Sequence, residues 1–270
     1  MKYRVIALDL DGTLTNNEKE VTPKTREALL HAMDDGAVVV LASGRPTYGV
    51  EPVADCLELD KRGGYILSYN GAKIVNWTTK ENLYAKHLPD GIIPEIYAFA
   101  KAYNYGLLGY KDNVIISENA SDRYALEECR INKMQIRQVD NLLENLEDEP
   151  IKLLMTGDPE VMARAEGEVS DLLGHRIDAF RSMPFFIELV AKGIDKAVSL
   201  QRLLHILRCA PAEMVAFGDG YNDISMLRYA GMGVAMGNAV PEVRAIANYI
   251  TLTNEEDGIA AALEHFALSE

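Results

Sequence analysis

Short apolar runs alternate with longer amphipathic stretches at both ends of this chain. The runs are rich in β-branched residues and too short for helices, so they predict buried strands. Thr22 as N-cap with Pro23 after it predicts a helix near 22–33. Apolar side chains spaced three and four residues apart predict a second helix near 195–207. This alternation predicts an α/β fold with a doubly wound, mainly parallel sheet that is covered on both faces. The strands are predicted at 5–8, 37–42, 65–68, 72–75, 214–217, 232–235 and 249–251.

Local signals refine three of the connecting segments. Pro52 fits the first turn of a helix better than its interior, so a helix is predicted to begin near Glu51. Asn70-Gly71 is a strong two-residue turn signal and predicts a tight hairpin between the strands on either side of it. A last helix is predicted from Asn254, where the acidic residues that follow suit a first turn.

The pattern changes between residues 83 and 186, where strands and helices follow one another in a different order. We expect an α+β domain with its own sheet here, inserted into an α/β domain formed by residues 1–82 and 187–270. Strands of the inserted domain are predicted near 83–87, 105–109, 113–117, 134–137, 151–155 and 185–190. Its helices are predicted near 92–103, 120–130, 140–146 and 159–172.

The charge of the whole chain narrows the class of partner. The 270 residues carry a formal net charge of −14, and the pI is about 4.9. This acidity argues against nucleic acids and anionic membrane surfaces as partners, because both attract basic proteins. No apolar run approaches the ~20 residues of a membrane span. Three widely spaced cysteines and no signal-peptide pattern predict a cytoplasmic protein, and the sequence makes no prediction of oligomeric state.

Two carboxylates follow the first predicted strand. Asp9 and Asp11 are two positions apart, so their side chains share one face of an extended chain, at the strand end where α/β sheets bind ligands. A calcium loop is a different interpretation, but Gly12 stands at the fourth position of that frame instead of the sixth. On this stretch alone, a pair of turn-forming aspartates remains an alternative to a functional pair.

Polar side chains also follow two other predicted strands, and a lysine opens a neighbouring helix. The carboxyl ends of parallel strands lie on one edge of a sheet, so we expect these groups to converge with Asp9 and Asp11. Several carboxylates at one point repel one another unless a cation lies between them. Mg²⁺ suits a few carboxylates and a phosphate ligand, whereas calcium would need more oxygen ligands. The additional groups are Ser43, Lys196, Asp219, Asn222 and Asp223.

Groups that could hold a phosphate lie beside this expected cation site. Leu10 turns its side chain away, but its backbone N–H can point into the site. Ser43 supplies a hydroxyl and Gly44 an unobstructed N–H, at a strand-to-helix turn of the kind that binds phosphate. Lys196 supplies a full positive charge, which would offset the repulsion between a carboxylate nucleophile and a phosphate ester.

With these groups in order, the chain resembles the haloacid dehalogenase-like phosphatases. It is most similar to their Cof-type branch, which carries a large cap domain inserted after the second motif, and within that branch to the broad sugar-phosphate phosphatases. The resemblance covers the whole chain and implies a Rossmann-like core with a cap that sets substrate specificity. The matching motifs are DLDGT at 9–13, LASGR at 41–45, DK at 195–196 and GDGYND at 218–223.

The resemblance implies a role for each matching residue. Asp9 corresponds to the nucleophile that forms an aspartyl-phosphate, and its second oxygen to a Mg²⁺ ligand. Asp11 corresponds to the general acid–base, and its backbone carbonyl to a second metal ligand. Asp219 corresponds to the third protein ligand of the metal, and Asp223 to a neighbour of the metal's waters. The residues that correspond to phosphate contacts are Leu10, Ser43, Gly44, Lys196 and Asn222.

Three positions leave alternatives open. The motif lysine is usually followed by glycine, but Ala197 follows Lys196, and Lys192 with its glycine imitates the pattern; the spacing favours Lys196. Arg45 could contact the substrate or be a solvated charge, and Asn70 could contribute to the site or only form its turn.

These observations predict a Mg²⁺-dependent phosphatase acting on small phosphorylated metabolites, with sugar phosphates as the expected class. One alternative is a sugar phosphomutase, although the cap contains no obvious arginine pair for a returning phosphate. Another is a phosphate-ligand sensor without turnover. The base next to the nucleophile, Asp11, argues against the sensor, because a lasting phosphoryl group requires that no base activates water beside it.

Overall fold

The computed structural model describes residues 3–267 and divides into two compact units. The first unit consists of Met1–Tyr84 and Asp195–Glu270, and the second is the single segment Ala85–Ile194. The second unit ends at residue 194, whereas the sequence pattern predicted that the inserted domain ends at residue 186. The reason is the strand β11, which pairs with two strands of the second unit's sheet and therefore belongs to that unit.

Eight strands form the sheet of the first unit, in the order β14-β13-β12-β1-β2-β3-β4-β5. Every pair from β14 to β3 is parallel, whereas β4 runs antiparallel to β3. The prediction of an α/β fold with a mainly parallel sheet is therefore confirmed. The strands are β1 Val5–Leu8, β2 Val38–Ala42, β3 Gly64–Ser68, β4 Lys73–Asn76, β5 Asn82–Ala85, β12 Met214–Gly218, β13 Met232–Ala235 and β14 Tyr249–Ile250.

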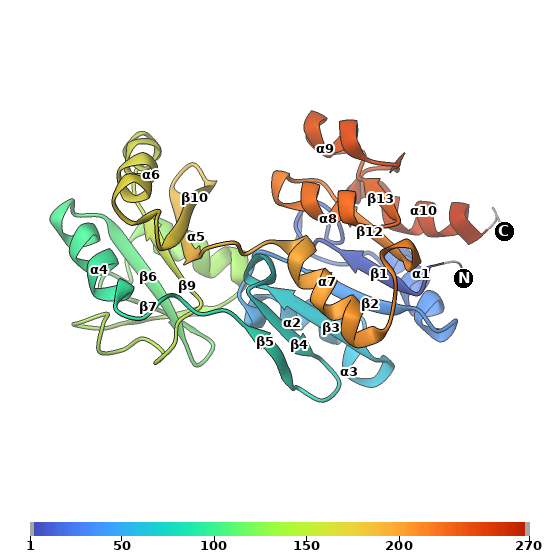
Figure 1. The fold of residues 1–270 in the computed structure, drawn as a ribbon, viewed down its shortest axis with the longest axis horizontal. Helices are drawn as coiled ribbons and strands as arrows, with labels where there is room; N and C mark the ends of the chain where they lie inside the picture. The colour runs from blue at the N-terminus through green and yellow to red at the C-terminus, as the bar shows by residue number, and fades with distance from the viewer. Residues whose placement is uncertain (1–2, 268–270) are drawn as a thin grey trace. The chain divides into compact units, whose positions relative to one another are not determined.

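Helices cover both faces of this sheet (Figure 1). Because side chains alternate along a strand, Ile6 and Leu8 of β1 pack against α1, α2 and α10, and Val5 and Ala7 pack against α7, α8 and α9. The central strand is thus buried on both sides, as its unbroken apolar run predicts. The helices are α1 Pro23–Asp34, α2 Thr47–Cys56, α3 Leu59–Arg62, α7 Lys196–Leu207, α8 Ile224–Tyr229, α9 Pro241–Ile246 and α10 Gly258–Ala267.

The second unit has its own sheet and its own core. Its six strands have the order β10-β11-β9-β6-β7-β8, and all of its pairs are antiparallel except β7 with β8. Side chains of α4 and α6 pack on one face of this sheet. Its strands are β6 Gly106–Lys111, β7 Val114–Ser117, β8 Gln135–Gln138, β9 Lys152–Thr156, β10 Ile177–Met183 and β11 Phe186–Ala191. Its helices are α4 Ile92–Ala102, α5 Arg123–Asn132 and α6 Pro159–Leu173.

Some predicted elements are wrong. The helix expected from Glu51 begins at Thr47, so Pro52 lies inside α2; the backbone bond lost there is offset by the burial of Val50 and Val53. No helix forms at 140–146. The strand β10 was not predicted, because it is an edge strand with mostly exposed residues and a weak apolar pattern. The strand expected at 83–87 is β5, which belongs to the first sheet. The last helix starts as a 3₁₀ turn, η4 Asn254–Glu256, before α10.

The predicted two-residue hairpin is also wrong. The strands β3 and β4 are joined by a longer 3₁₀ turn, η1, over Tyr69–Gly71. Its residues Tyr69, Asn70 and Gly71 have φ of 53°, 56° and 95°. The strands still pair antiparallel, up to Ser68 and Lys73, so only the length of the turn was wrong. The N–H groups of Tyr69 and Asn70 donate to the backbone oxygens of Arg45 and Ser43, so the segment after β2 also holds this turn.

None of the helices described in residues 3–267 has both the length and the apolar character needed to cross a bilayer.

Candidate active site

Three neighbouring parallel strands end at the same edge of the first sheet. The strand β1 lies between β12 and β2, and Asp9, Asp219 and Ser43 are the residues that directly follow these three strands. The N–H of Asp9 donates to the carbonyl oxygen of Phe217 in β12 over 3.1 Å, which fixes the position of the Asp9 backbone. The convergence expected from sequence order is therefore observed for these residues.

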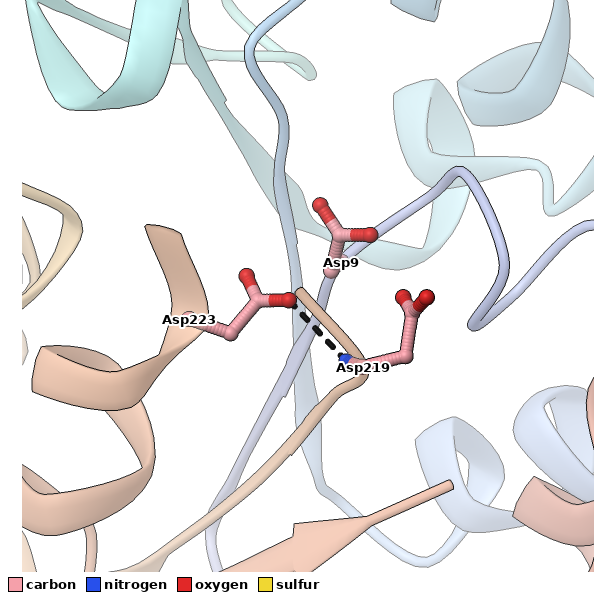
Figure 2. A group of neighbouring side chains, drawn as sticks. All are labelled: Asp9, Asp219 and Asp223. Carbon is pink, nitrogen blue, oxygen red and sulfur yellow. Dashed lines mark hydrogen bonds between the residues drawn. The ribbon is translucent and has the colours of Figure 1, made fainter. Parts of the chain in front are cut away.

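Three carboxylates meet at this edge (Figure 2). Asp9, Asp219 and Asp223 each offer an oxygen atom, and these atoms lie within 4.8 Å of one another. Asp223 ends the 3₁₀ turn η3 Tyr221–Asp223 and is fully buried. Its Oδ2 accepts from the backbone N–H groups of Asp219 and Gly220, each over 3.0 Å. The carboxylate of Asp223 therefore stabilises the loop after β12.

One lysine balances two of these carboxylates. Nζ of Lys196 lies 2.6 Å from Oδ1 of Asp9 and 2.6 Å from Oδ1 of Asp223. Burial of the lysine disfavours its charged form, but the two carboxylates outweigh burial and raise the pKa of Lys196 above its ordinary value. Lys192, the other candidate from the sequence, lies in the second unit with a half-exposed side chain. The structure thus brings Lys196 to Asp9, although Ala197 follows it.

The cluster carries more negative than positive charge. Burial, followed by the charge of Asp223, raises the pKa of Asp9 well above its usual value. Burial also raises the pKa of Asp219, to about 6. Three carboxylates and one ammonium group are left with an excess of negative charge when all are ionised. Oxygen donors with this charge excess fit a hard divalent cation, so the cluster could hold a metal ion of the Mg²⁺ type.

A glycine turn allows the loop after β1 to approach Asp219. Gly12 has φ of +83°, and a Cβ atom at this position would clash with the carboxylate of Asp219. The next residue, Thr13, donates from Oγ1 to Oδ1 of Asp219 over 2.8 Å. Gly12 is therefore required both by its backbone conformation and by the close approach of a carboxylate.

Asp11 lies outside the group of three carboxylates and has partners of its own. Its oxygens accept from Nε and Nη2 of Arg45 over 2.8 and 2.6 Å, and Nζ of Lys19 lies 2.7 Å from Oδ1. Burial alone would raise the pKa of Asp11, but the hydrogen bonds and charges of Arg45 and Lys19 outweigh burial and lower it. Arg45 is only 7% exposed, so the alternative of a solvated charge is excluded.

The residues predicted to contact phosphate surround the same sheet edge. The side chain of Leu10 is buried in the core, as expected if only its backbone N–H serves the site. Ser43 is buried, and Gly44 lies under the amide of Asn70, which a Cβ atom on the glycine would approach to 3.2 Å. Asn222 is exposed, and its Nδ2 donates to Oδ1 of Asn70 over 3.0 Å. Asn70 thus connects two segments of the site in addition to forming its turn.

Sequence reasoning missed several of these relations. The sharing of Lys196 between Asp9 and Asp223 follows from the loop after β12, whose shape no pattern predicts. Thr13 lies inside a quoted motif, so its bond to Asp219 had a signal in the sequence. Lys19 had none, because a lysine in a polar loop is normally solvated.

Comparisons with known proteins agree with this arrangement. The chain matches the haloacid dehalogenase-like hydrolase family over residues 6–263. It is 32% identical over 273 residues to 5-amino-6-(5-phospho-D-ribitylamino)uracil phosphatase YitU of Bacillus subtilis strain 168, with 99% of each chain covered.

Solved structures lead to the same family. A haloacid dehalogenase-like hydrolase from Bacteroides thetaiotaomicron superposes with a TM-score of 0.96 at 46% identity, covering 98% of this chain and 99% of that one. The HAD subclass IIB sugar phosphatase BT4131 superposes with a TM-score of 0.81 at 26% identity, covering 98% and 99%. The chain therefore belongs to the haloacid dehalogenase-like hydrolases and is a phosphatase enzyme of that family, as its four motifs predict.

Proposed function

We propose that this chain is a Mg²⁺-dependent phosphatase that hydrolyses small phosphomonoesters, with sugar phosphates as its main substrates, through an aspartyl-phosphate on Asp9. The observation that carries the proposal is the gathering of Asp9, Asp219 and Asp223 around one point, with Lys196 bonded to Asp9 and Asp223. Asp9 is buried, its Oδ1 accepts from Lys196 over 2.6 Å, and its carboxylate lies within 4.8 Å of oxygens from Asp219 and Asp223.

The first step is the transfer of the phosphoryl group to Asp9. One oxygen of Asp9 attacks phosphorus, and the bond between phosphorus and the ester oxygen breaks. The leaving oxygen takes a proton from the protonated form of Asp11, which is the minor form because Arg45 and Lys19 lower the pKa of this carboxyl, and departs as an alcohol. Lys196 and the backbone N–H groups of Leu10 and Gly44 stabilise the charge on the phosphoryl oxygens during this transfer.

The second step releases phosphate and restores the enzyme. Asp11, now a carboxylate, takes a proton from water as that water attacks phosphorus, and the bond between phosphorus and Asp9 breaks. A Mg²⁺ ion held by Asp9, the backbone carbonyl of Asp11 and Asp219 would supply positive charge that offsets the repulsion between carboxylate and phosphate.

Two observations, the net charge of the chain and the names of its relatives, support the proposed substrate class. The net charge of −14 gives no general attraction for polyanions, so a small ester that the local lysine can bind is favoured over a nucleic acid. The relatives include a sugar phosphatase and a phosphatase for a ribityl phosphate, and both names describe phosphate esters of a sugar or sugar-alcohol chain. The second unit, Ala85–Ile194, is proposed to choose among such esters, as the cap domain of this family.

The test is hydrolysis of p-nitrophenyl phosphate and of a panel of hexose, pentose and sugar-alcohol phosphates in Mg²⁺. The wild-type chain is expected to release inorganic phosphate, and Asp9→Asn is expected to lower kcat at least ~10³-fold, because the nucleophile is lost. Asp60→Asn is the matched control, since it makes the same change on α3, which precedes β3 and so lies away from the carboxyl ends of the strands.

Other products would identify other functions. Unchanged turnover in Asp9→Asn would contradict the proposal. Conversion of glucose 1-phosphate to an isomeric phosphate without release of phosphate would indicate a mutase. A phosphoryl group that stays on the intact protein after treatment with acetyl phosphate would indicate a sensor.

A further inference from the structure

Arg45 is a buried arginine to which the mechanism above gives no role. It is 7% exposed, although arginine side chains at a strand end normally extend into water. Its backbone N–H donates to Oγ of Ser43 over 3.1 Å, and its Nη1 donates to the carbonyl oxygen of Gly49 in α2 over 3.1 Å. Arg45 is therefore held at its backbone and at its guanidinium.

The remaining edge of this guanidinium holds the carboxylate of Asp11. Nε donates to Oδ2 over 2.8 Å and Nη2 donates to Oδ1 over 2.6 Å, so the two groups form a pair of parallel bonds. Only a planar fork such as guanidinium matches both carboxylate oxygens in this way. The Asp11 side chain is itself 36% exposed, so packing does not enclose it, and its polar partners Arg45 and Lys19 set its orientation.

We propose that Arg45 is a positioning residue for the reaction, a role that rests on the proposed function: it holds Asp11 in the orientation in which one oxygen exchanges protons with the leaving alcohol and with water. Lys19 contacts Oδ1, the oxygen that also accepts from Nη2 of Arg45. A carboxylate offers about four acceptor positions. The contacts made by the described residues occupy two on Oδ1 and one on Oδ2. The fourth position, on Oδ2, is the one that carries the proton.

Two other roles for Arg45 make different predictions. If the guanidinium bound the phosphate of the substrate, its loss would weaken binding whether or not Asp11 could transfer a proton. If it only anchored α2 through Gly49, its loss would lower stability and would affect all substrates equally. A positioning role acts through Asp11, so its effect should vanish once Asp11 is replaced.

The acidity of the leaving group separates these roles. p-Nitrophenolate leaves without being protonated, whereas the alkoxide of a sugar phosphate needs the proton of Asp11. Because kcat/KM reports the step that forms the aspartyl-phosphate, loss of positioning should affect sugar phosphates and spare p-nitrophenyl phosphate. The water step needs Asp11 for both substrates, so p-nitrophenolate should then appear in a burst before slower turnover.

The experiment measures both substrates with Arg45→Gln, Arg45→Lys, Asp11→Asn and the double variant Arg45→Gln/Asp11→Asn, in Mg²⁺. The sugar phosphate is the one that the wild-type chain hydrolyses fastest in the panel above. Each Arg45 variant is expected to lower kcat/KM for it by about 10- to 100-fold, and for p-nitrophenyl phosphate by less than about 3-fold. In the Asp11→Asn background, loss of Arg45 is expected to change kcat/KM less than about 2-fold.

Arg26→Gln is the matched control. Arg26 also bonds a backbone carbonyl, that of Cys56 over 2.8 Å, and a carboxylate, Oε1 of Glu58 over 2.9 Å. It lies in α1 of the same unit, so its loss should cost comparable stability. The ratio of kcat/KM between the two substrates should stay at the wild-type value.

Several results would overturn the proposal. These are an equal loss on both substrates, full recovery with Arg45→Lys, or a further loss in the Asp11→Asn background. If Arg45→Gln does not fold, Arg45→Lys, which keeps the buried charge, carries the test; failure of both to fold would make Arg45 a structural residue and overturn it too. A wild-type chain that hydrolyses neither ester would instead overturn the proposed function.

Discussion

At the scale of single residues, Asp219 illustrates a competition between a proton and a metal ion. Burial raises its pKa to about 6, and the hydrogen bond from Thr13, which favours the carboxylate, is too weak to reverse this shift. Without an ion, the folded chain therefore favours the protonated acid more than the unfolded chain does. A metal ligand must be ionised, so an ion that binds here has to displace that proton.

This competition predicts a particular dependence of stability on pH. The pKa of Asp219 is higher in the folded state than in the unfolded state, so the free energy of unfolding of the metal-free protein should fall as pH rises from about 4 through about 6. Asp9, whose pKa is also raised, acts in the same direction. Added Mg²⁺ should therefore stabilise the protein more at pH 8 than at pH 5.

Urea unfolding in EDTA and in Mg²⁺, across this range of pH, measures the effect. Asp219→Asn, which cannot ionise, should flatten the dependence seen in EDTA and weaken the gain from Mg²⁺. An equal gain from Mg²⁺ at pH 5 and pH 8 would contradict the prediction.

At the scale of elements, the start of α7 combines a structural task with a chemical one. Asp195 is the N-cap, and its Oδ1 accepts from the N–H groups of Ala197 and Val198 over 2.8 and 3.2 Å. The first residue of the helix is Lys196, whose Nζ bonds Asp9. The cap therefore fixes the backbone from which the lysine reaches the cluster.

Replacing this cap should affect both stability and activity. Asp195→Ala is expected to cost about 1 kcal/mol of unfolding free energy. It should also lower kcat for p-nitrophenyl phosphate several-fold, because the backbone of Lys196 is no longer fixed by the cap. Asp122→Ala is the matched control, since Asp122 caps α5 in the second unit by the same pair of bonds, each 3.0 Å long. It should cost a similar free energy and leave kcat for this small substrate unchanged; an equal loss of kcat in both variants would refute the assignment.

The elements that the sequence predicts well are those whose environment is uniform. The strands β1, β2 and β12 are buried on both faces, so their apolar runs are unbroken and their order places Asp9, Ser43 and Asp219 at one edge. Other segments are harder to predict, because side-chain hydrogen bonds to the local backbone compete with a regular helix. At 140–146, Oδ1 of Asn141 accepts from the backbone N–H of Leu143, a local bond that competes with a helix.

The side-chain pairs of the site were harder to predict than its backbone. Four motifs identify which residues gather at the sheet edge, because parallel topology alone brings strand ends together. The pairing of Arg45 with Asp11 depends on the direction of a long side chain after a turn, and the link between Asn70 and Asn222 joins segments far apart in the chain. No periodicity or turn signal encodes contacts of this kind.

At the scale of the whole molecule, each of the two units has apolar side chains of its own that pack around its sheet. The sheet of the first unit is packed on both faces, and the second unit has a separate cluster of apolar side chains between its sheet and α4 and α6. All three carboxylates of the cluster belong to the first unit. An ion bound there should therefore stabilise the first unit directly.

Hydrogen exchange should reveal this division. Mg²⁺ is expected to slow exchange in β1 and β12, which carry Asp9 and Asp219, and to leave β9 and β11 of the second unit unchanged. Mass spectrometry of peptides with and without Mg²⁺ measures both. The variant Asp219→Asn should abolish the difference, and equal slowing in both units would show that the ion acts on the chain as a whole.

The second unit is a single continuous segment, Ala85–Ile194, that leaves the chain between β5 and α7. None of the strands that carry the carboxylates is interrupted by it. Mutations can therefore accumulate in that segment over generations while the reaction chemistry is inherited intact. If the second unit chooses the ester, as proposed, such changes would alter the substrate and leave the three carboxylates in place.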